Sequence, residues 1–172
     1  MIDKIKARVM FIHGLESNVP SEKTKYLEKH FTLFAPQIDY RKQNIFAEVL
    51  EMAKDFKPEL IIGSSMGGYF GYYIAGELNL PAILFNPALP YRTTIKPEIN
   101  SENKHLKIAR FVLGKNDNII EAKDNLNWIS KNQNYIDDIS ISMLNFEHRV
   151  PIEIFIDEIE NYYRLKWRKK QQ

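Results

Sequence analysis

The chain has 172 residues, of which 44% are hydrophobic and 12% aromatic, so it can bury the core of one domain, expected over residues 1–172. Lysine and arginine number 24 against 22 aspartates and glutamates, and the net charge of +2 gives no reason to expect a nucleic acid partner. The absence of cysteine excludes disulfides, thiolate catalysis and cysteine-ligated zinc. No run approaches the ~20 apolar residues of a membrane helix, and no leader is recognisable, so the expected location is the cytoplasm.

Short apolar runs alternate along the chain with segments of helical periodicity. The runs that predict strands are residues 8–12, 31–35, 60–63, 81–85, 108–113 and 139–144. The segments that predict helices are residues 21–30, 45–56, the stretch after 65, 121–131 and 152–163. This alternation is typical of an α/β protein with a doubly wound, mostly parallel sheet of about six strands. We expect helices on both faces of the sheet and no large cap domain.

Two stretches lie outside this alternation. Residues 87–105 form the one long irregular segment, and we expect a short lid or loop at the edge of the sheet where ligands bind. Residues 164–170 are basic and contain one tryptophan. They are compatible with contact to anionic lipid or nucleic acid, but the favoured interpretation is a helix end whose cations complement the negative end of the helix dipole.

The most informative motif is G-x-S-x-G at residues 63–67, between a predicted strand and a predicted helix. A serine on such a tight turn has its hydroxyl exposed, and Gly63 and Gly67 remove Cβ atoms that would clash. The N-terminus of the following helix favours developing negative charge. We therefore predict that Ser65 is a nucleophile rather than a structural turn serine.

A serine nucleophile needs a base, and the base needs an orienting acid. Downstream of Ser65 there are two histidines, and only His148 follows a predicted strand, whereas His105 precedes one. We predict His148 as the base. The acid is expected in the turn after the fifth strand, where Asp117 lies; its alternative role is an Asx-turn. Glu121 and Asp124 lie further on, inside the predicted helix.

Developing negative charge on the substrate oxygen requires hydrogen-bond donors. The backbone N–H of Met66 follows the nucleophile, and the N–H of Leu15 lies in the loop after the first strand, next to Gly14, which permits close approach. These two groups are the predicted oxyanion hole. His13 is expected to be a structural histidine that lines the site. We expect no metal and no cofactor, because the four histidines are scattered and no H-E-x-x-H is present.

Several of these motifs together resemble a known family. They are residues 11–18 (FIHGLESN), Pro20-Ser21-x-Lys23, residues 63–69 (GSSMGGY), Asn86-Pro87-Ala88, Gly114-x-x-Asp117 and the late His148. The chain is similar over most of its length to the small bacterial YqiA-like esterases of the α/β-hydrolase superfamily. The resemblance implies a compact α/β-hydrolase that acts on short acyl esters. One departure is Glu147 beside the base, where the family commonly has a glycine-rich approach.

The resulting hypothesis is a serine esterase with a Ser65–His148–Asp117 triad and an acyl-enzyme intermediate. Its expected partner is a small acyl ester. A thioesterase or an acyltransferase would use the same triad. A rival from another class is a catalytically silent hydrolase fold that serves as a binding protein, since fold alone does not determine function.

Overall fold

A computed structural model describes residues 7–15, 17–91 and 106–169, with side chains to residue 165. It contains one six-stranded sheet in the order β2-β1-β3-β4-β5-β6, in which every neighbouring pair is parallel. The strands are β1 (Arg8–Ile12), β2 (Thr32–Phe34), β3 (Leu60–Ser64), β4 (Pro81–Phe85), β5 (Leu106–Gly114) and β6 (Ile136–Leu144). The strand order reverses between β1 and β3, and ligands of such sheets bind beyond the carboxyl ends of the strands near this point.

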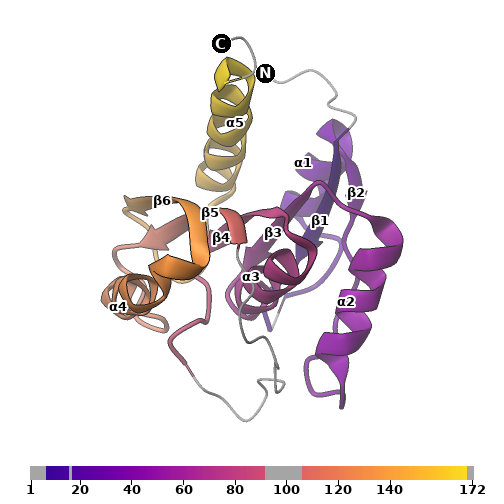
Figure 1. Ribbon diagram of the computed structural model, residues 1–172, viewed down its shortest axis with the longest axis horizontal. Coiled ribbons are helices and arrows are strands. Elements are labelled where there is room, and N and C mark those ends of the chain that lie inside the picture. The colour runs from indigo at the N-terminus through magenta and orange to yellow at the C-terminus, as the bar shows by residue number, and fades with distance from the viewer. Residues whose placement is uncertain (1–6, 16, 92–105, 170–172) are drawn as a thin grey trace.

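The helices cover both faces of the sheet. They are α1 (Glu22–His30), α2 (Ile45–Phe56), α3 (Met66–Leu78), α4 (Ala122–Asn132) and α5 (Ile152–Lys169), with a short 3₁₀ turn, η1 (Gln133–Tyr135). Helices α2, α3 and α4 pack on one face, and α1 and α5 pack on the other (Figure 1). Among the described residues, no helix combines the length and the apolar character needed to cross a bilayer.

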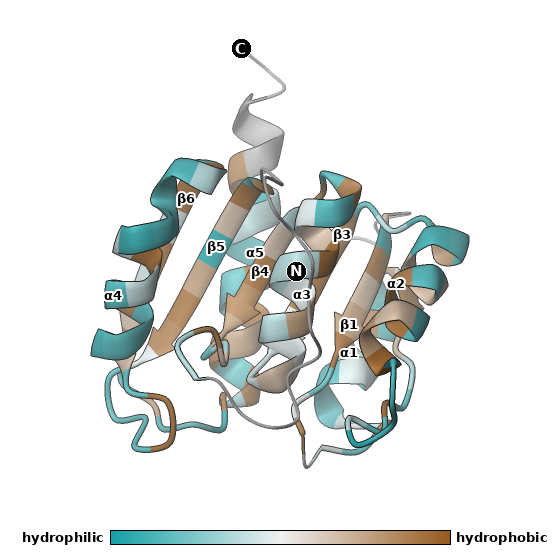
Figure 2. Ribbon diagram, turned by 60° about the horizontal axis from the view of Figure 1, so that its bottom comes forward, coloured by the Kyte–Doolittle hydropathy of each residue, from teal (hydrophilic) through white to brown (hydrophobic). Residues whose placement is uncertain are grey.

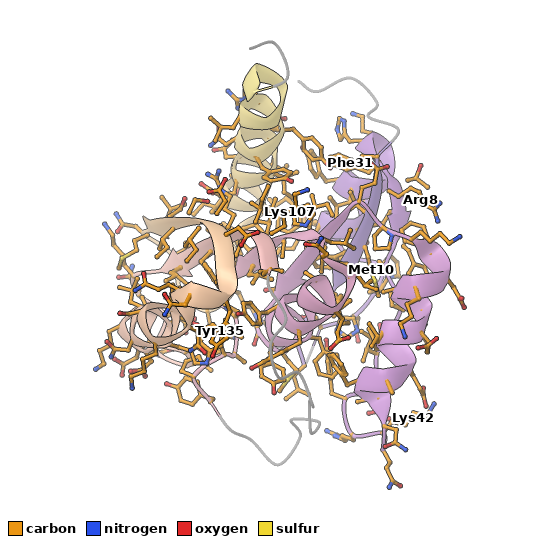
Figure 3. The ribbon with its side chains drawn as sticks, in the orientation of Figure 1. Arg8, Met10, Phe31, Lys42, Lys107 and Tyr135 are labelled. Atoms are coloured by element: carbon orange, nitrogen blue, oxygen red, sulfur yellow. The ribbon has the colours of Figure 1, made fainter. Side chains whose placement is uncertain are left out.

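Two hydrophobic cores lie on the two faces because successive strand residues point to opposite sides. On β1, Met10 and Ile12 belong to the core under α2, α3 and α4, whereas Val9 and Phe11 belong to the core under α1 and α5. Figure 2 shows the strands as predominantly hydrophobic and the helices as mixed. In Figure 3 the Met10 side chain lies inside the molecule, while Lys42 extends away from it. Fully burying one such apolar side chain contributes roughly 1.5–3 kcal/mol.

The predicted α/β fold is confirmed, with small differences at the ends of the elements. Strand β6 begins at Ile136 rather than 139, because Ile136 is buried and pairs with Leu106 even though two exposed aspartates follow it. Helix α1 begins after Ser21, which forms a capping box with Thr24. Residues 92–105, which make up most of the predicted lid and include His105, and residue 170 at the basic end lie outside the described residues.

Candidate active site

The predicted nucleophile lies on a strained turn between β3 and α3. Ser65 has φ 54° and ψ −118°, a region that a non-glycine residue rarely adopts. Backbone hydrogen bonds hold this conformation: the N–H of Ser65 donates to the carbonyl of Phe85 at 2.9 Å, and its own carbonyl accepts from Tyr69 and Ala88 at 3.0 Å each. The turn therefore depends on both the neighbouring strand and the first turn of α3.

Glycines around the turn allow backbone segments to come very close. A Cβ added to Gly67 would overlap the carbonyl oxygens of Ile12 and His13, and one added to Gly63 would overlap the backbone of Gly67. Gly14 differs, because an added Cβ there would meet its nearest atoms at 3.4–3.5 Å, which is ordinary contact. None of the described glycines has a positive φ. Gly63 and Gly67 are thus required by close approach, whereas the close approach expected of Gly14 is not observed.

The structure brings Ser65, His148 and Asp117 together at the carboxyl edge of the sheet. The Nδ1 atom of His148 lies 2.8 Å from Oδ2 of Asp117, and its Nε2 atom lies 3.0 Å from Oγ of Ser65. The other carboxylate oxygen of Asp117 accepts the N–H groups of Ile119 and Ile120, both at 2.9 Å. Asp117 is 4% exposed. The aspartate is therefore held by its own turn while its second oxygen faces the imidazole.

Asn86, directly after β4, links the segments that carry these side chains. Its amide NH₂ donates to the carbonyls of Glu147 and His148, both at 3.1 Å, and its Oδ1 accepts the N–H of Gly114 at 2.7 Å. The side chain is 1% exposed, and φ is 40°. Sequence reasoning identified Asn86-Pro87 only as the end of a strand and as part of the family motif. The signal in the sequence was an asparagine directly after a predicted strand, because its amide can both donate and accept hydrogen bonds.

One predicted oxyanion donor follows Ser65 in the chain, and the other lies in a loop that lines the same cavity. Met66 is the first residue of α3, where backbone N–H groups have no acceptor within the helix. Leu15 lies in the turn after β1 and lines the same cavity as Ser65. In the described part of the chain, neither N–H donates to a protein acceptor. Both groups thus remain available to an oxygen atom bound next to Ser65.

His13 is buried beside the site and both of its ring nitrogens are used. Its Nε2 accepts the N–H of Ile38 at 2.9 Å, which requires a neutral ring with the proton on Nδ1, and Nδ1 donates to the carbonyl of Gly14 at 2.6 Å. Burial lowers the pKa of His13, and the hydrogen bond to Gly14 opposes this in part. The hydroxyl of Tyr40 donates to the carbonyl of His13. These contacts support a structural role rather than a role as base.

A cavity of about 530 Å³ opens in front of the Ser65 hydroxyl and the imidazole of His148. Leu15 lines one side, and two basic residues that the sequence analysis did not assign to the site, Lys23 and Arg149, also line it. Among the described residues, no cluster of three or more histidine, aspartate or glutamate side chains is arranged to hold a metal ion. The chemistry available at this cavity is nucleophilic attack by a hydroxyl next to an imidazole.

Three solved structures show the fold to which the chain is similar. Alpha/beta hydrolase domain-containing protein 10 from mouse superposes with a TM-score of 0.67 and 14% identity, and the match covers 92% of each chain. The esterase Pf2001 from Pyrococcus furiosus superposes with a TM-score of 0.67 and 14% identity, and the match covers 92% of this chain and 81% of that one. Acyl-protein thioesterase 2 from Zea mays superposes with a TM-score of 0.67 and 16% identity, and the match covers 93% of each chain. The chain therefore has the α/β-hydrolase fold.

Sequence comparison identifies the family. No curated protein matches the chain. The sequence profile of the Uncharacterised protein family (UPF0227) matches residues 8–137, which include β1 to β5, the Ser65 turn and Asp117. This match covers more than half of the chain and confirms the resemblance to the YqiA-like proteins. The chain belongs to the UPF0227 family.

Proposed function

We propose that the protein is a serine hydrolase that cleaves short acyl esters. The observation that supports it is the continuous chain of contacts from Asp117 through His148 to the Ser65 hydroxyl, at 2.8 and 3.0 Å. A carboxylate, an imidazole and a hydroxyl brought together in this geometry from three separate segments are the arrangement expected of a catalytic triad. The esterase and thioesterase activities named for two structural neighbours favour the same chemistry.

The reaction would proceed in two halves. Oγ of Ser65 attacks the ester carbonyl while Nε2 of His148 takes its proton, and Asp117 stabilises the imidazolium that forms. The N–H groups of Leu15 and Met66 donate to the oxyanion. The imidazolium then protonates the leaving alcohol, which leaves an acyl group on Ser65. In the second half, Nε2 of His148 takes a proton from a water molecule that attacks the acyl carbonyl; the bond to Oγ then breaks, the imidazolium returns the proton to Oγ of Ser65, and the acid is released.

Labelling with a fluorophosphonate probe tests this proposal, because the probe reacts with an activated serine and distinguishes an enzyme from a binding protein. The wild-type protein should be labelled and should hydrolyse p-nitrophenyl acetate or butyrate. Ser65→Ala should lose the label and about 10⁴–10⁶ in kcat. The control is Ser130→Ala, an exposed serine on α4 that should behave as wild type. Absence of labelling in the wild type, or labelling that persists in Ser65→Ala, would overturn the proposal.

A further inference from the structure

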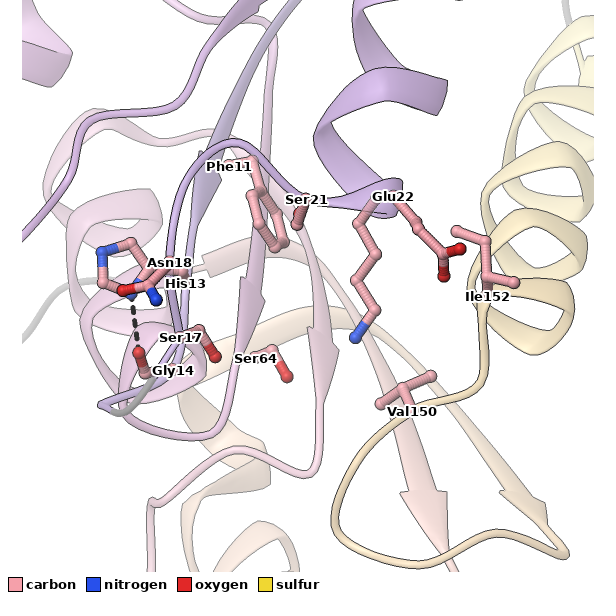
Figure 4. Close-up of a pocket in the computed structure, with 11 residues that line it drawn as sticks. Phe11, His13, Gly14, Ser17, Asn18, Ser21, Glu22, Ser64, Val150 and Ile152 are labelled. Atoms are coloured by element: carbon pink, nitrogen blue, oxygen red, sulfur yellow. Dashed lines mark hydrogen bonds between the residues drawn. The ribbon is translucent and has the colours of Figure 1, made fainter.

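The cavity in front of Ser65 continues into a smaller one of about 180 Å³. The two share five lining residues, Gly14, Ser17, Lys23, Ser64 and Val150. Figure 4 shows the smaller cavity, with the side chains of Ser17 and Ser64 close together between the β1–α1 loop and the end of β3. Polar donors therefore continue from the nucleophile turn into a recess whose volume suits a small group rather than a long alkyl chain.

One cationic side chain lies at this junction and a second lies beside it in the larger cavity. Lys23, in the first turn of α1, lines both cavities, and its ammonium lies 5.5 Å from the centre of the Phe155 ring. Arg149 directly follows His148 and lines the larger cavity. In the part of the chain that the structure describes, neither cation has a carboxylate oxygen within 4.0 Å. Within residues 7–15, 17–91 and 106–165, no ion pair therefore neutralises the charge of Lys23 or Arg149.

The described carboxylates nearest along the chain, Glu22 and Glu147, form no ion pair with Lys23 or Arg149. Glu22 lines the smaller cavity and Glu147 lines the larger one, and both are exposed. Burial and the nearby guanidinium of Arg149 lower the pKa of Lys23 to about 8. At neutral pH the ammonium is thus still mostly charged, in surroundings that disfavour the charge and would favour a bound anion.

We propose that Lys23, assisted by Arg149, forms an anion subsite and that the natural ester carries a carboxylate or phosphate group. This inference rests on the proposed ester hydrolysis at Ser65, because it assigns the substrate class of that same cavity. The hydroxyls of Ser17 and Ser64 are further donors to the anion. The anionic group would lie where the two cavities meet, against Lys23 and facing Arg149 in the larger cavity, while the ester carbonyl lies at Ser65. Charge-assisted hydrogen bonds of this kind are stronger than neutral ones.

Two matched pairs of esters test the subsite. On the acyl side, mono-p-nitrophenyl adipate is compared with p-nitrophenyl hexanoate; on the alcohol side, 2-acetoxyethyl phosphate is compared with 2-methoxyethyl acetate. The rate measured with Ser65→Ala is subtracted from each rate, so that only hydrolysis that depends on Ser65 is compared. In at least one pair, the wild type should prefer the anionic ester by about 10-fold or more in kcat/KM, and Lys23→Met should reduce this preference by about 10–100-fold. Arg149→Met should reduce it less, because Arg149 is exposed.

The matched control is Lys25→Met, which removes an exposed lysine of the same helix that does not line either cavity. It should keep the wild-type preference. No preference in either pair, or a preference that survives in Lys23→Met, would overturn the subsite while leaving ester hydrolysis intact. The pair that responds identifies whether the anion belongs to the acyl or the alcohol part.

A binding measurement separates this inference from the proposed function. Adipate and inorganic phosphate are titrated into Ser65→Ala protein by calorimetry, with and without Lys23→Met. Binding of either anion that is weakened about 10-fold or more by Lys23→Met supports the subsite even if no ester is turned over, in which case the proposed hydrolysis fails. Equal binding of each anion to both proteins, or no binding of either, contradicts the subsite.

Discussion

At the scale of single residues, the two oxygens of Asp117 have different partners. Oδ1 accepts the N–H groups of Ile119 and Ile120, and Oδ2 faces Nδ1 of His148. The backbone donors fix the orientation of the carboxylate, so that Oδ2 can hold only an Nδ1–H imidazole. In that tautomer, Nε2 carries the lone pair that accepts the proton of Ser65.

The Asp117→Asn variant should therefore fold but lose about 10⁴ in kcat for a short ester. Its amide oxygen would keep the two backbone N–H groups, which turns the NH₂ group toward His148 and stabilises the tautomer with the proton on Nε2. Asp124→Asn is the control, because Asp124 accepts only from Tyr91 Oη among the described contacts of its side chain. Steady-state kinetics together with thermal melts check this. A crippled Asp124→Asn beside an active Asp117→Asn would reverse the assignment of the acid.

Pattern reasoning reached Ser65 through the G-x-S-x-G motif. It reached Asp117 and His148 because each lies in the segment after a predicted strand, and parallel strands end at one edge of the sheet. It did not reach Asn86, whose partners are 28 to 62 residues away in the sequence. Nor did it reach Lys23 and Arg149, which meet only when α1 and the segment before α5 pack together. Contacts between distant segments leave no periodicity that a single sequence displays.

At the scale of elements, the position of α3 depends on how closely its first turn approaches β1. Gly67 lies against the carbonyl groups at the end of β1, and the Cβ of any other residue would overlap them. The same contact places Ser65 and the N–H of Met66 next to the loop that holds Leu15. The packing of α3 on β1 thus also sets the distance between the N–H groups of Leu15 and Met66, the predicted oxyanion hole.

Gly67→Ala should destabilise the protein by about 1–3 kcal/mol or more, because α3 must move away from β1 to admit the methyl group. Gly14→Ala is the matched control for stability, since its Cβ would meet only ordinary contacts at 3.4–3.5 Å. Urea unfolding followed by circular dichroism gives both values. Equal stability of the two variants would mean that the α3–β1 contact is looser than described.

The ends of the elements were harder to predict than their existence. Pro81–Phe85 and Ile45–Phe56 match the predicted ranges, because an apolar run or an apolar helix face ends there with the element. The start of strand β6 does not match its predicted range. This strand lies at the edge of the sheet, where Asp137 and Asp138 remain exposed while the backbone around them pairs with β5. Hydrophobicity indicates burial, and an edge strand extends beyond its buried part.

At the scale of the whole molecule, Lys23 couples the predicted substrate cavity to the stability of the fold. The side chain starts on α1 and its ammonium lies near the ring of Phe155 on α5, with Arg149, Glu147 and His148 on the segment that leads into α5. Burial and Arg149 lower the pKa of Lys23 to about 8, against about 10.4 in an unfolded chain. Between these values the unfolded chain binds a proton that the folded protein does not, so this group makes the free energy of unfolding rise with pH.

Lys23→Met should therefore be more stable than the wild type at pH 7, where the wild type holds a half-buried charge. Each pKa unit corresponds to about 1.4 kcal/mol, so the difference in Tm should reach several degrees. The advantage should shrink between about pH 8 and pH 10.4, where the wild type gains stability and the variant does not.

The control is Lys25→Met, which removes an exposed lysine on the same helix and should show no such trend. Thermal melts of the three proteins at half-unit pH intervals measure the effect, and other titrating groups cancel in the differences. A difference that stays constant between pH 7 and about pH 10.4 would mean that folding does not change the pKa of Lys23, and the charge at the junction of the two cavities would then not be disfavoured.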